Sequence, residues 1–140
     1  MTRFPDDLRA FLSEGTRTGK LAYVAADGRP LVAPVWFVLD GDDLLFNTGK
    51  ATGKARAIAR DPRVAVCVDS EVPPFGFVQV QGEAAVSEDL DDLVSSATAI
   101  GARYMGADRA EEFGRRNGVP GELLVRVRVS KVIANLNMTG

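Results

Sequence analysis

The residues best suited to chemistry lie in one short segment, residues 48–63, whose sequence is TGKATGKARAIARDPR. Two threonines, two glycines and two lysines stand where a predicted strand, residues 44–47, is followed by a predicted helix, residues 52–60. Backbone N–H groups at a helix start and the side-chain donors around it can bind the same anion. The segment is therefore predicted to hold a phosphate group.

The same residues have a simpler interpretation, because Lys50 and Lys54 are four positions apart and most such pairs lie on a solvated helix face. The neighbouring threonines add hydroxyl donors and the glycines let a ligand approach the backbone, which favours a binding site. A Walker motif would need a serine or threonine where Ala55 stands, so nucleotide hydrolysis is disfavoured. The candidate ligands in the segment are Thr48, Gly49, Lys50, Thr52 and Lys54.

The missing residue types narrow the chemistry further. The 140-residue chain has no histidine and one cysteine, Cys67. Ser-His and Cys-His catalytic pairs, an internal disulfide and the usual zinc sites are therefore excluded, and no metal site is expected. If the protein is an enzyme, we expect its chemistry to come from a bound cofactor.

Charge gives no sign of a macromolecular partner. The 17 basic and 19 acidic residues are interspersed and give a net charge of −2, so no overall field favours nucleic acid or an anionic membrane. The N-terminus has neither a basic region nor a long apolar run. We expect a protein of the reducing cytoplasm that binds neither nucleic acid nor membrane.

The pattern of elements predicts a mainly β fold with added helices in a single domain, residues 1–140. Hairpin turns join most of the strands, which does not fit a doubly wound parallel sheet and favours a six-stranded antiparallel barrel. The first three strands are expected to form a meander. The predicted strands are residues 21–25, 30–39, 44–47, 63–68, 77–86 and 123–133. The predicted helices are residues 3–12, 52–60, a long one capped by Ser87, and a shorter one starting at Asp108.

The second predicted strand, residues 30–39, is apolar on both faces, whereas a barrel strand that faces water alternates. Its outer face is therefore expected to be covered by a helix of the chain, a second subunit or a flat ligand. We favour a homodimer. Trp36 in this strand fits a core or interface position better than a stacking partner when it is taken alone.

Three other polar residues have two interpretations each. Tyr104 ends an amphipathic helix and either packs there or donates a hydrogen bond into a site. Arg126 and Arg128 point the same way along the last strand, where they are either solvated or anchor an extended anionic ligand.

The order and spacing of several motifs resemble those of the pyridoxamine 5′-phosphate oxidase-like proteins, which have the FMN-binding split β-barrel fold. The resemblance extends over residues 18–133. Two of the motifs, residues 102–106 and 121–128, are similar to the branch of that family that depends on the deazaflavin coenzyme F420. The others are DGRP at 27–30, PVWFV at 34–38, Asp40 with Gly41, Lys54, and DPR at 61–63.

This resemblance implies a homodimer of six-stranded split barrels with two cofactor sites at the subunit interface. The ring system would lie against one strand segment and the phosphate would lie against the segment described first. The residues implied for the ring are Pro34, Val35 and Trp36, and those implied for the phosphate are Thr48, Lys50 and Lys54.

Two departures from the family matter. Branch members often carry a further basic residue near position 52, where this chain has Thr52. The true pyridoxamine phosphate oxidases hold their substrate with a histidine and an arginine near the C-terminus. Because this chain has no histidine, oxidation of vitamin B6 is not expected.

The resemblance implies a reductase that transfers a hydride between F420 and an unsaturated or conjugated small organic acceptor. An FMN-binding reductase or oxidase on the same fold is one alternative, since the two cofactors share a phosphate and a ribityl chain. A non-catalytic flavin or deazaflavin carrier is another. The lactyl and oligoglutamate tail of F420 needs an open basic groove, for which Lys20, Arg126 and Arg128 are candidates. No catalytic residue and no acceptor are assigned.

Overall fold

The computed structural model describes residues 3–140, which contain seven strands, four α-helices and one 3-10 turn, η1 (Ala107–Arg109). The strands are β1 (Gly19–Val24), β2 (Pro30–Val35), β3 (Phe37–Asp40), β4 (Asp43–Gly49), β5 (Arg63–Asp69), β6 (Phe77–Ser87) and β7 (Glu122–Asn135). The helices are α1 (Asp6–Ser13), α2 (Gly53–Arg60), α3 (Leu90–Met105) and α4 (Ala110–Asn117). None of the helices within residues 3–140 has the length and apolar character needed to cross a membrane.

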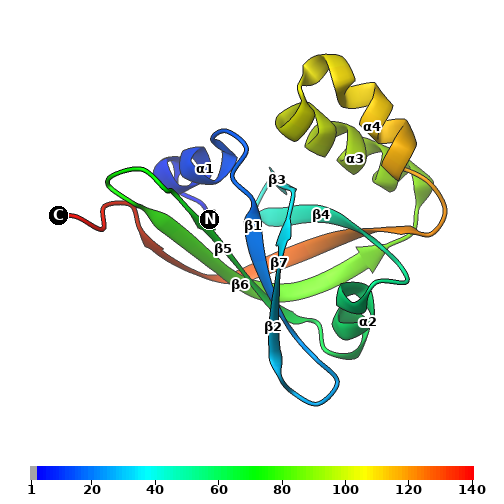
Figure 1. The fold of residues 1–140 in the computed structure, drawn as a ribbon, viewed down its shortest axis with the longest axis horizontal. Coiled ribbons are helices and arrows are strands. Elements are labelled where there is room, and N and C mark those ends of the chain that lie inside the picture. The colour runs from blue at the N-terminus through cyan, green and yellow to red at the C-terminus, as the bar shows by residue number, and fades with distance from the viewer. Residues whose placement is uncertain (1–2) are drawn as a thin grey trace.

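The strands form one curled sheet in the order β2-β1-β5-β6-β7-β4-β3, and every pair of neighbours is antiparallel (Figure 1). The prediction of a mainly β antiparallel fold with helices is therefore confirmed. In Figure 1, α3 and α4 lie side by side as a hairpin above the end of the sheet that contains β3 and β4, while α1 and α2 lie at different ends of the curled sheet.

The predicted count of six strands is wrong by one, because residues 30–39 divide at Trp36. β2 pairs with β1 at one edge of the sheet, and β3 pairs with β4 at the other edge. The chain thus passes from one edge to the opposite edge through a single unpaired residue, and this curls the sheet into a half-barrel. The predicted three-strand meander is also wrong, since the two hairpins lie at opposite edges.

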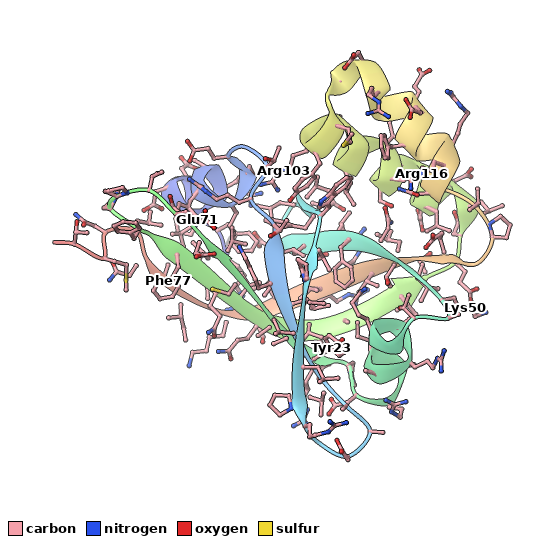
Figure 2. All side chains as sticks on the ribbon, in the orientation of Figure 1. Tyr23, Lys50, Glu71, Phe77, Arg103 and Arg116 are labelled. Carbon is pink, nitrogen blue, oxygen red and sulfur yellow. The ribbon has the colours of Figure 1, made fainter. Side chains whose placement is uncertain are left out.

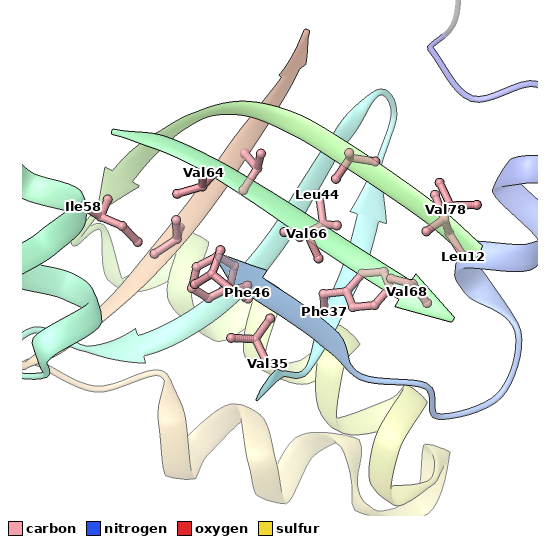
Figure 3. Packing of buried hydrophobic residues seen from close by; sticks show 14 of the residues in the cluster. Leu12, Val35, Phe37, Leu44, Phe46, Ile58, Val64, Val66, Val68 and Val78 are labelled. Atoms are coloured by element: carbon pink, nitrogen blue, oxygen red, sulfur yellow. The ribbon is translucent and has the colours of Figure 1, made fainter. Parts of the chain in front are cut away.

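Apolar side chains fill the inside of the curled sheet (Figure 3). Alternate residues of β5 and β6 point inward, as the period-two pattern predicts. Leu12 of α1 and Ile58 of α2 cover the core near its two ends. Each such side chain stabilises the fold by about 1.5–3 kcal/mol when fully buried. Fully buried members include Phe37, Phe46, Leu21, Leu44, Val66, Val68, Val78, Val80 and Val125.

Side-chain caps start the helices next to the sheet. Thr52 caps α2, because its hydroxyl accepts a hydrogen bond from the amide of Ala55. Asp89, rather than the expected Ser87, is the N-cap of α3, and its carboxylate accepts from the amide of Asp92. The Ser87 hydroxyl instead accepts from the amide of Asp89, two residues further along the chain, so the predicted cap lies two residues too early.

Glycines allow α3 and α4 to pack closely. A Cβ on Gly101 of α3 would lie 2.6 Å from the Cβ of Phe113 in α4, and a Cβ on Gly114 would overlap the hydroxyl of Thr98. The position of α4 against α3 is therefore fixed by close packing. Helix α3 in turn contacts β3, β4 and β7.

Replacing Gly101 by alanine tests this packing. In an open helix alanine is more stable than glycine by about 1 kcal/mol, but the new Cβ would meet Phe113 here. We expect Gly101→Ala to lower the free energy of unfolding by about 1–3 kcal/mol, as overpacking does, in chemical denaturation of the unliganded protein. Gly53→Ala is the matched control, since a Cβ there meets nothing within 4 Å. An unchanged or higher stability for Gly101→Ala would contradict the packing.

Candidate functional site

A pocket of about 260 Å³ lies where the corner between β2 and β3 meets β4, α2, α3 and α4. It brings together the segment that the family resemblance implies for the ring system, residues 34–36, and part of the segment predicted to hold a phosphate, residues 48–63. Four of the eight predicted site residues line it. The lining residues are Pro34, Val35, Trp36, Asn47, Lys54, Ile100 and Asn117.

Lys54 supplies the positive charge of this pocket. Within residues 3–140, no ion pair or hydrogen bond is formed by its ammonium group, and it stands in the first turn of α2. The backbone N–H groups of Gly53 and Lys54 also have no acceptor in the described chain, as expected for the first residues of a helix. An unpaired ammonium beside free helix amides is an arrangement that binds phosphate.

The neighbouring threonines hold the turn before α2 and are less available to a ligand. The Thr52 hydroxyl donates to the carbonyl of Gly49 at 2.8 Å and accepts from the Ala55 amide at 3.2 Å. Because a hydroxyl has one proton, the contact of 3.2 Å between Thr48 Oγ1 and Thr52 Oγ1 uses the proton of Thr48. Thr48 is buried, with 7 % of its surface exposed. The hydroxyls of Thr48 and Thr52 therefore stabilise the turn before α2.

Lys50 lies outside the pocket. Its ammonium group pairs with the carboxylate of Glu88 at 3.0 Å, and its amide donates to the carbonyl of Gly121 at 2.8 Å. Figure 2 shows Lys50 close to α2 at the end of β4. Of the two lysines that the sequence could not separate, only Lys54 combines a pocket position with a free charge.

Trp36 forms an aromatic cluster with the two helices of the hairpin. Its indole stacks on the ring of Tyr104, with centroids 5.1 Å apart and an interplanar angle of 3°. Phe113 lies tilted at 57° with its centroid 6.3 Å from that of Trp36. Trp36 nevertheless keeps 40 % of its surface exposed. It therefore lines the pocket while the two aromatic rings pack against it.

The hydroxyl of Tyr104 is fully used by the backbone. It donates to the carbonyl of Arg17 at 2.8 Å and accepts from the amide of Phe37 at 3.2 Å. Burial raises the pKa of Tyr104, which keeps the hydroxyl protonated. The interpretation in which this hydroxyl donates a hydrogen bond into the site is therefore not supported by the geometry.

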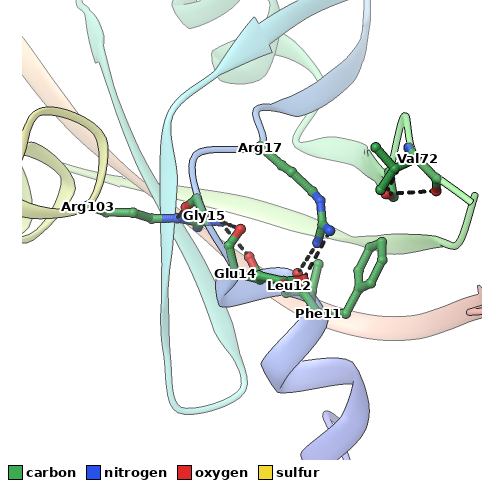
Figure 4. Close-up of polar contacts among 8 residues, drawn as sticks. Phe11, Leu12, Glu14, Gly15, Arg17, Val72 and Arg103 are labelled. Atoms are coloured by element: carbon green, nitrogen blue, oxygen red, sulfur yellow. Dashed lines mark hydrogen bonds and ion pairs between the residues drawn. The ribbon is translucent and has the colours of Figure 1, made fainter.

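Arg103 precedes Tyr104 and binds backbone carbonyls of α1, of the loop after it and of β3. Figure 4 shows its contacts with the end of α1 and the loop that follows. Its guanidinium donates to the carbonyls of Phe37 and Leu12, each at 2.8 Å, and to that of Gly15 at 2.9 Å. No carboxylate of residues 3–140 pairs with it, and burial lowers the pKa of this guanidinium. Arg103 thus joins the end of α3 to β3 and to the loop after α1.

The candidates for a basic groove are mostly neutralised. Arg126 donates to the carboxylates of Asp40 and Asp43 at 2.9 and 3.0 Å, and these two partners raise the pKa of its guanidinium. Lys20 pairs with Asp69 at 2.9 Å. Arg128 is exposed and lies outside the pocket.

Sequence reasoning missed three pocket residues, Asn47, Ile100 and Asn117. Asn47 was assigned to the end of a strand and Asn117 to the end of a helix, and nothing in either pattern shows that the two elements meet. The Asn47 amide donates to Ser96 at 3.0 Å, which fixes its orientation.

Across residues 3–140, no three His, Cys, Asp or Glu side chains gather closely enough to hold a metal.

Comparison with known proteins gives matches over nearly the whole chain. The family model for pyridoxamine 5′-phosphate oxidase matches residues 4–135. The F420H2-dependent biliverdin reductase of Mycobacterium tuberculosis is 27 % identical over 137 residues, which cover 98 % of this chain and 92 % of that protein.

Solved structures show the same fold. A conserved hypothetical protein from Mycobacterium tuberculosis aligns with a TM-score of 0.83 and 20 % identity, over 99 % of this chain and 86 % of that one. A protein described as an F420 reductase aligns with a TM-score of 0.70 and 26 % identity, over 89 % of this chain and 94 % of that one. The activities stated for the similar proteins are those of oxidoreductases. By the match over residues 4–135, the chain belongs to the pyridoxamine 5′-phosphate oxidase family.

Proposed function

We propose that this protein is an F420-dependent reductase that acts on an unsaturated or conjugated organic acceptor. One observation carries the proposal: a single pocket joins the unpaired Lys54 at the start of α2 to the apolar wall of Pro34, Val35 and Trp36. An anionic group next to a flat ring system is the ligand that such a pocket fits. The two relatives whose descriptions name F420, at 27 % and 26 % identity, support the deazaflavin as that ligand.

The residues present fit such a cofactor. Lys54 and the free amides of Gly53 and Lys54 would hold the phosphate, and open space beside Gly53 allows a ligand to reach the backbone. Pro34, Val35 and Trp36 would lie against the ring and exclude water from it. When bound, a reduced deazaflavin supplies a hydride.

Apart from the Lys54 ammonium, which would hold the phosphate, the residues that line the pocket contribute no acid or nucleophile. Its lining residues are apolar side chains, two asparagines and one lysine. The proton of Tyr104 is donated to the Arg17 carbonyl, so we assign any proton uptake to solvent. The role of the chain in catalysis is therefore to bind the cofactor, to orient it and to shield its ring from water.

A second copy of the chain is part of the proposal. The pocket of about 260 Å³ is smaller than the roughly 300–1,000 Å³ of typical cofactor sites. Beside it, the edge strand β2 exposes Leu31 by 37 % and Val32 by 68 %. An exposed apolar edge strand is a surface that proteins normally cover. We propose that the partner of a homodimer covers this strand and completes the site.

FMN is the alternative cofactor. A phosphate and a flat ring would occupy the same residues, and the pairing of Lys20 and Arg126 with carboxylates leaves few free cations for the oligoglutamate tail of F420. A carrier that binds either cofactor without turnover is the second alternative.

Parallel fluorescence titrations with F420 and FMN test the cofactor. We expect F420 to bind with a dissociation constant in the micromolar range, roughly −8 kcal/mol, and FMN to bind more weakly. Equal or tighter binding of FMN, or a protein that is yellow when purified, would favour the FMN alternative. If F420 binds but no acceptor in a panel of conjugated compounds oxidises its reduced form, the protein is a carrier.

Charge removal tests the phosphate end of the site. We expect Lys54→Ala to weaken F420 binding by about 1.5–3 kcal/mol, the usual contribution of a hydrogen bond to a charged group. Lys50→Ala should have a smaller effect, because Lys50 is paired with Glu88. Lys131→Ala, on the exposed part of β7, is the control for the change in net charge. Equal losses for Lys54→Ala and Lys131→Ala would place the phosphate elsewhere.

A charge on the exposed strand tests the homodimer. We expect the native protein to sediment at twice the 15.0 kDa chain mass in analytical ultracentrifugation. Val32→Asp should shift it towards the monomer and weaken cofactor binding, because a carboxylate would have to be buried in the interface. A monomeric native protein that binds the cofactor as tightly as expected would rule out the second subunit.

A further inference from the structure

We propose that Tyr104 is a positioning residue that fixes the orientation of Trp36 in the wall of the pocket. The inference rests on the proposed function, since that function gives Trp36 its contact with the ring system. It replaces the interpretation in which the Tyr104 hydroxyl donates a hydrogen bond into the site. Three features of the structure lead to it.

The first feature is that the sheet does not hold Trp36. The register pairs Val35 with Gly19 in β1 and Phe37 with Phe46 in β4, but Trp36 between them has no partner strand. Its side chain is also partly exposed. The direction of the indole must therefore be set by side-chain packing.

The second feature is the nature of that packing. Tyr104 covers the indole with a nearly parallel ring, at an interplanar angle of 3°, whereas Phe113 approaches at 57° and from farther away. A parallel stack fixes the plane of both rings. Of these two neighbours, Tyr104 therefore restricts the indole more.

The third feature is that Tyr104 is itself fixed from two sides. Its hydroxyl donates to the Arg17 carbonyl in the loop after α1 and accepts from the Phe37 amide in β3. The guanidinium of Arg103 lies 5.0 Å from its ring centroid. The ring is thus held by backbone groups of the loop after α1 and of β3, and its fixed position restricts the indole of Trp36.

Two substitutions separate the ring from the hydroxyl. Tyr104→Phe keeps the stack and removes both hydrogen bonds, whereas Tyr104→Leu removes the stack as well. Trp36 is the only tryptophan of the chain, so the tryptophan band of the near-UV circular dichroism spectrum and the tryptophan emission report on this residue alone. Far-UV circular dichroism and thermal unfolding verify that each variant is folded.

We expect the unliganded Tyr104→Leu protein to lose most of the tryptophan near-UV band and to bind F420 about tenfold more weakly, the upper end of what an aromatic pair contributes. Tyr104→Phe should fall between Tyr104→Leu and the native protein in both the tryptophan band and the dissociation constant, because the stack remains while the two hydrogen bonds that fix the ring are removed. A dissociation constant and tryptophan band for Tyr104→Leu that equal the native ones would overturn the proposal. A large loss of kcat in Tyr104→Phe with unchanged binding would also overturn it, because the hydroxyl would then act chemically.

A double-mutant cycle with Trp36→Leu tests whether Tyr104 acts through Trp36. If it does, Tyr104→Leu should change F420 affinity much less in the Trp36→Leu background than in the native one. Additive losses would show an independent effect of Tyr104 and would overturn the proposal. If the native protein binds neither F420 nor FMN, the proposed function fails, while the near-UV band of unliganded Tyr104→Leu still decides whether Tyr104 orients Trp36.

Discussion

The fold depends on the passage of the chain from one edge of the sheet to the other at Trp36. Val35 is the last residue paired with β1, and Phe37 is the first paired with β4. Both of these neighbours are buried while Trp36 is partly exposed. The change of edge at Trp36 therefore curls the sheet. It also places Phe37 in the core and Trp36 in the wall of the pocket. Any change that moves this corner would alter core and site together.

The backbone at the corner needs hydrogen bonds from outside the sheet, because Trp36 has no partner strand. Arg103 and Tyr104 provide them at the carbonyl and the amide of Phe37. An arginine suits the last turn of α3, where the helix dipole favours a cation, and its planar donors reach several carbonyls at once. The same side chains bind carbonyls of the loop after α1. Stability and site geometry thus share one set of contacts.

Local patterns predicted most of the strands, and they predicted the start of α2. Alternation along β6 and the Asp-Gly turn at Gly28, which has a φ of 88°, are visible in the sequence and recur in the structure. The break at Trp36 was not predictable in the same way, because an uninterrupted apolar run gives no sign of a change of edge. Spacing could not separate Lys50 from Lys54, and it could not bring Asn117 to the pocket, since both facts come from tertiary contacts.

Position 52 shows how the local structure limits the charge of the site. The Thr52 hydroxyl caps α2 and also ties the preceding turn to Gly49. A basic side chain there would add a cation but would remove the cap, which is worth about 1 kcal/mol. With threonine in place, α2 begins in a fixed position and its first amides stay free. In the proposed site, the phosphate would therefore depend on Lys54 and on the free amides of this ordered helix start.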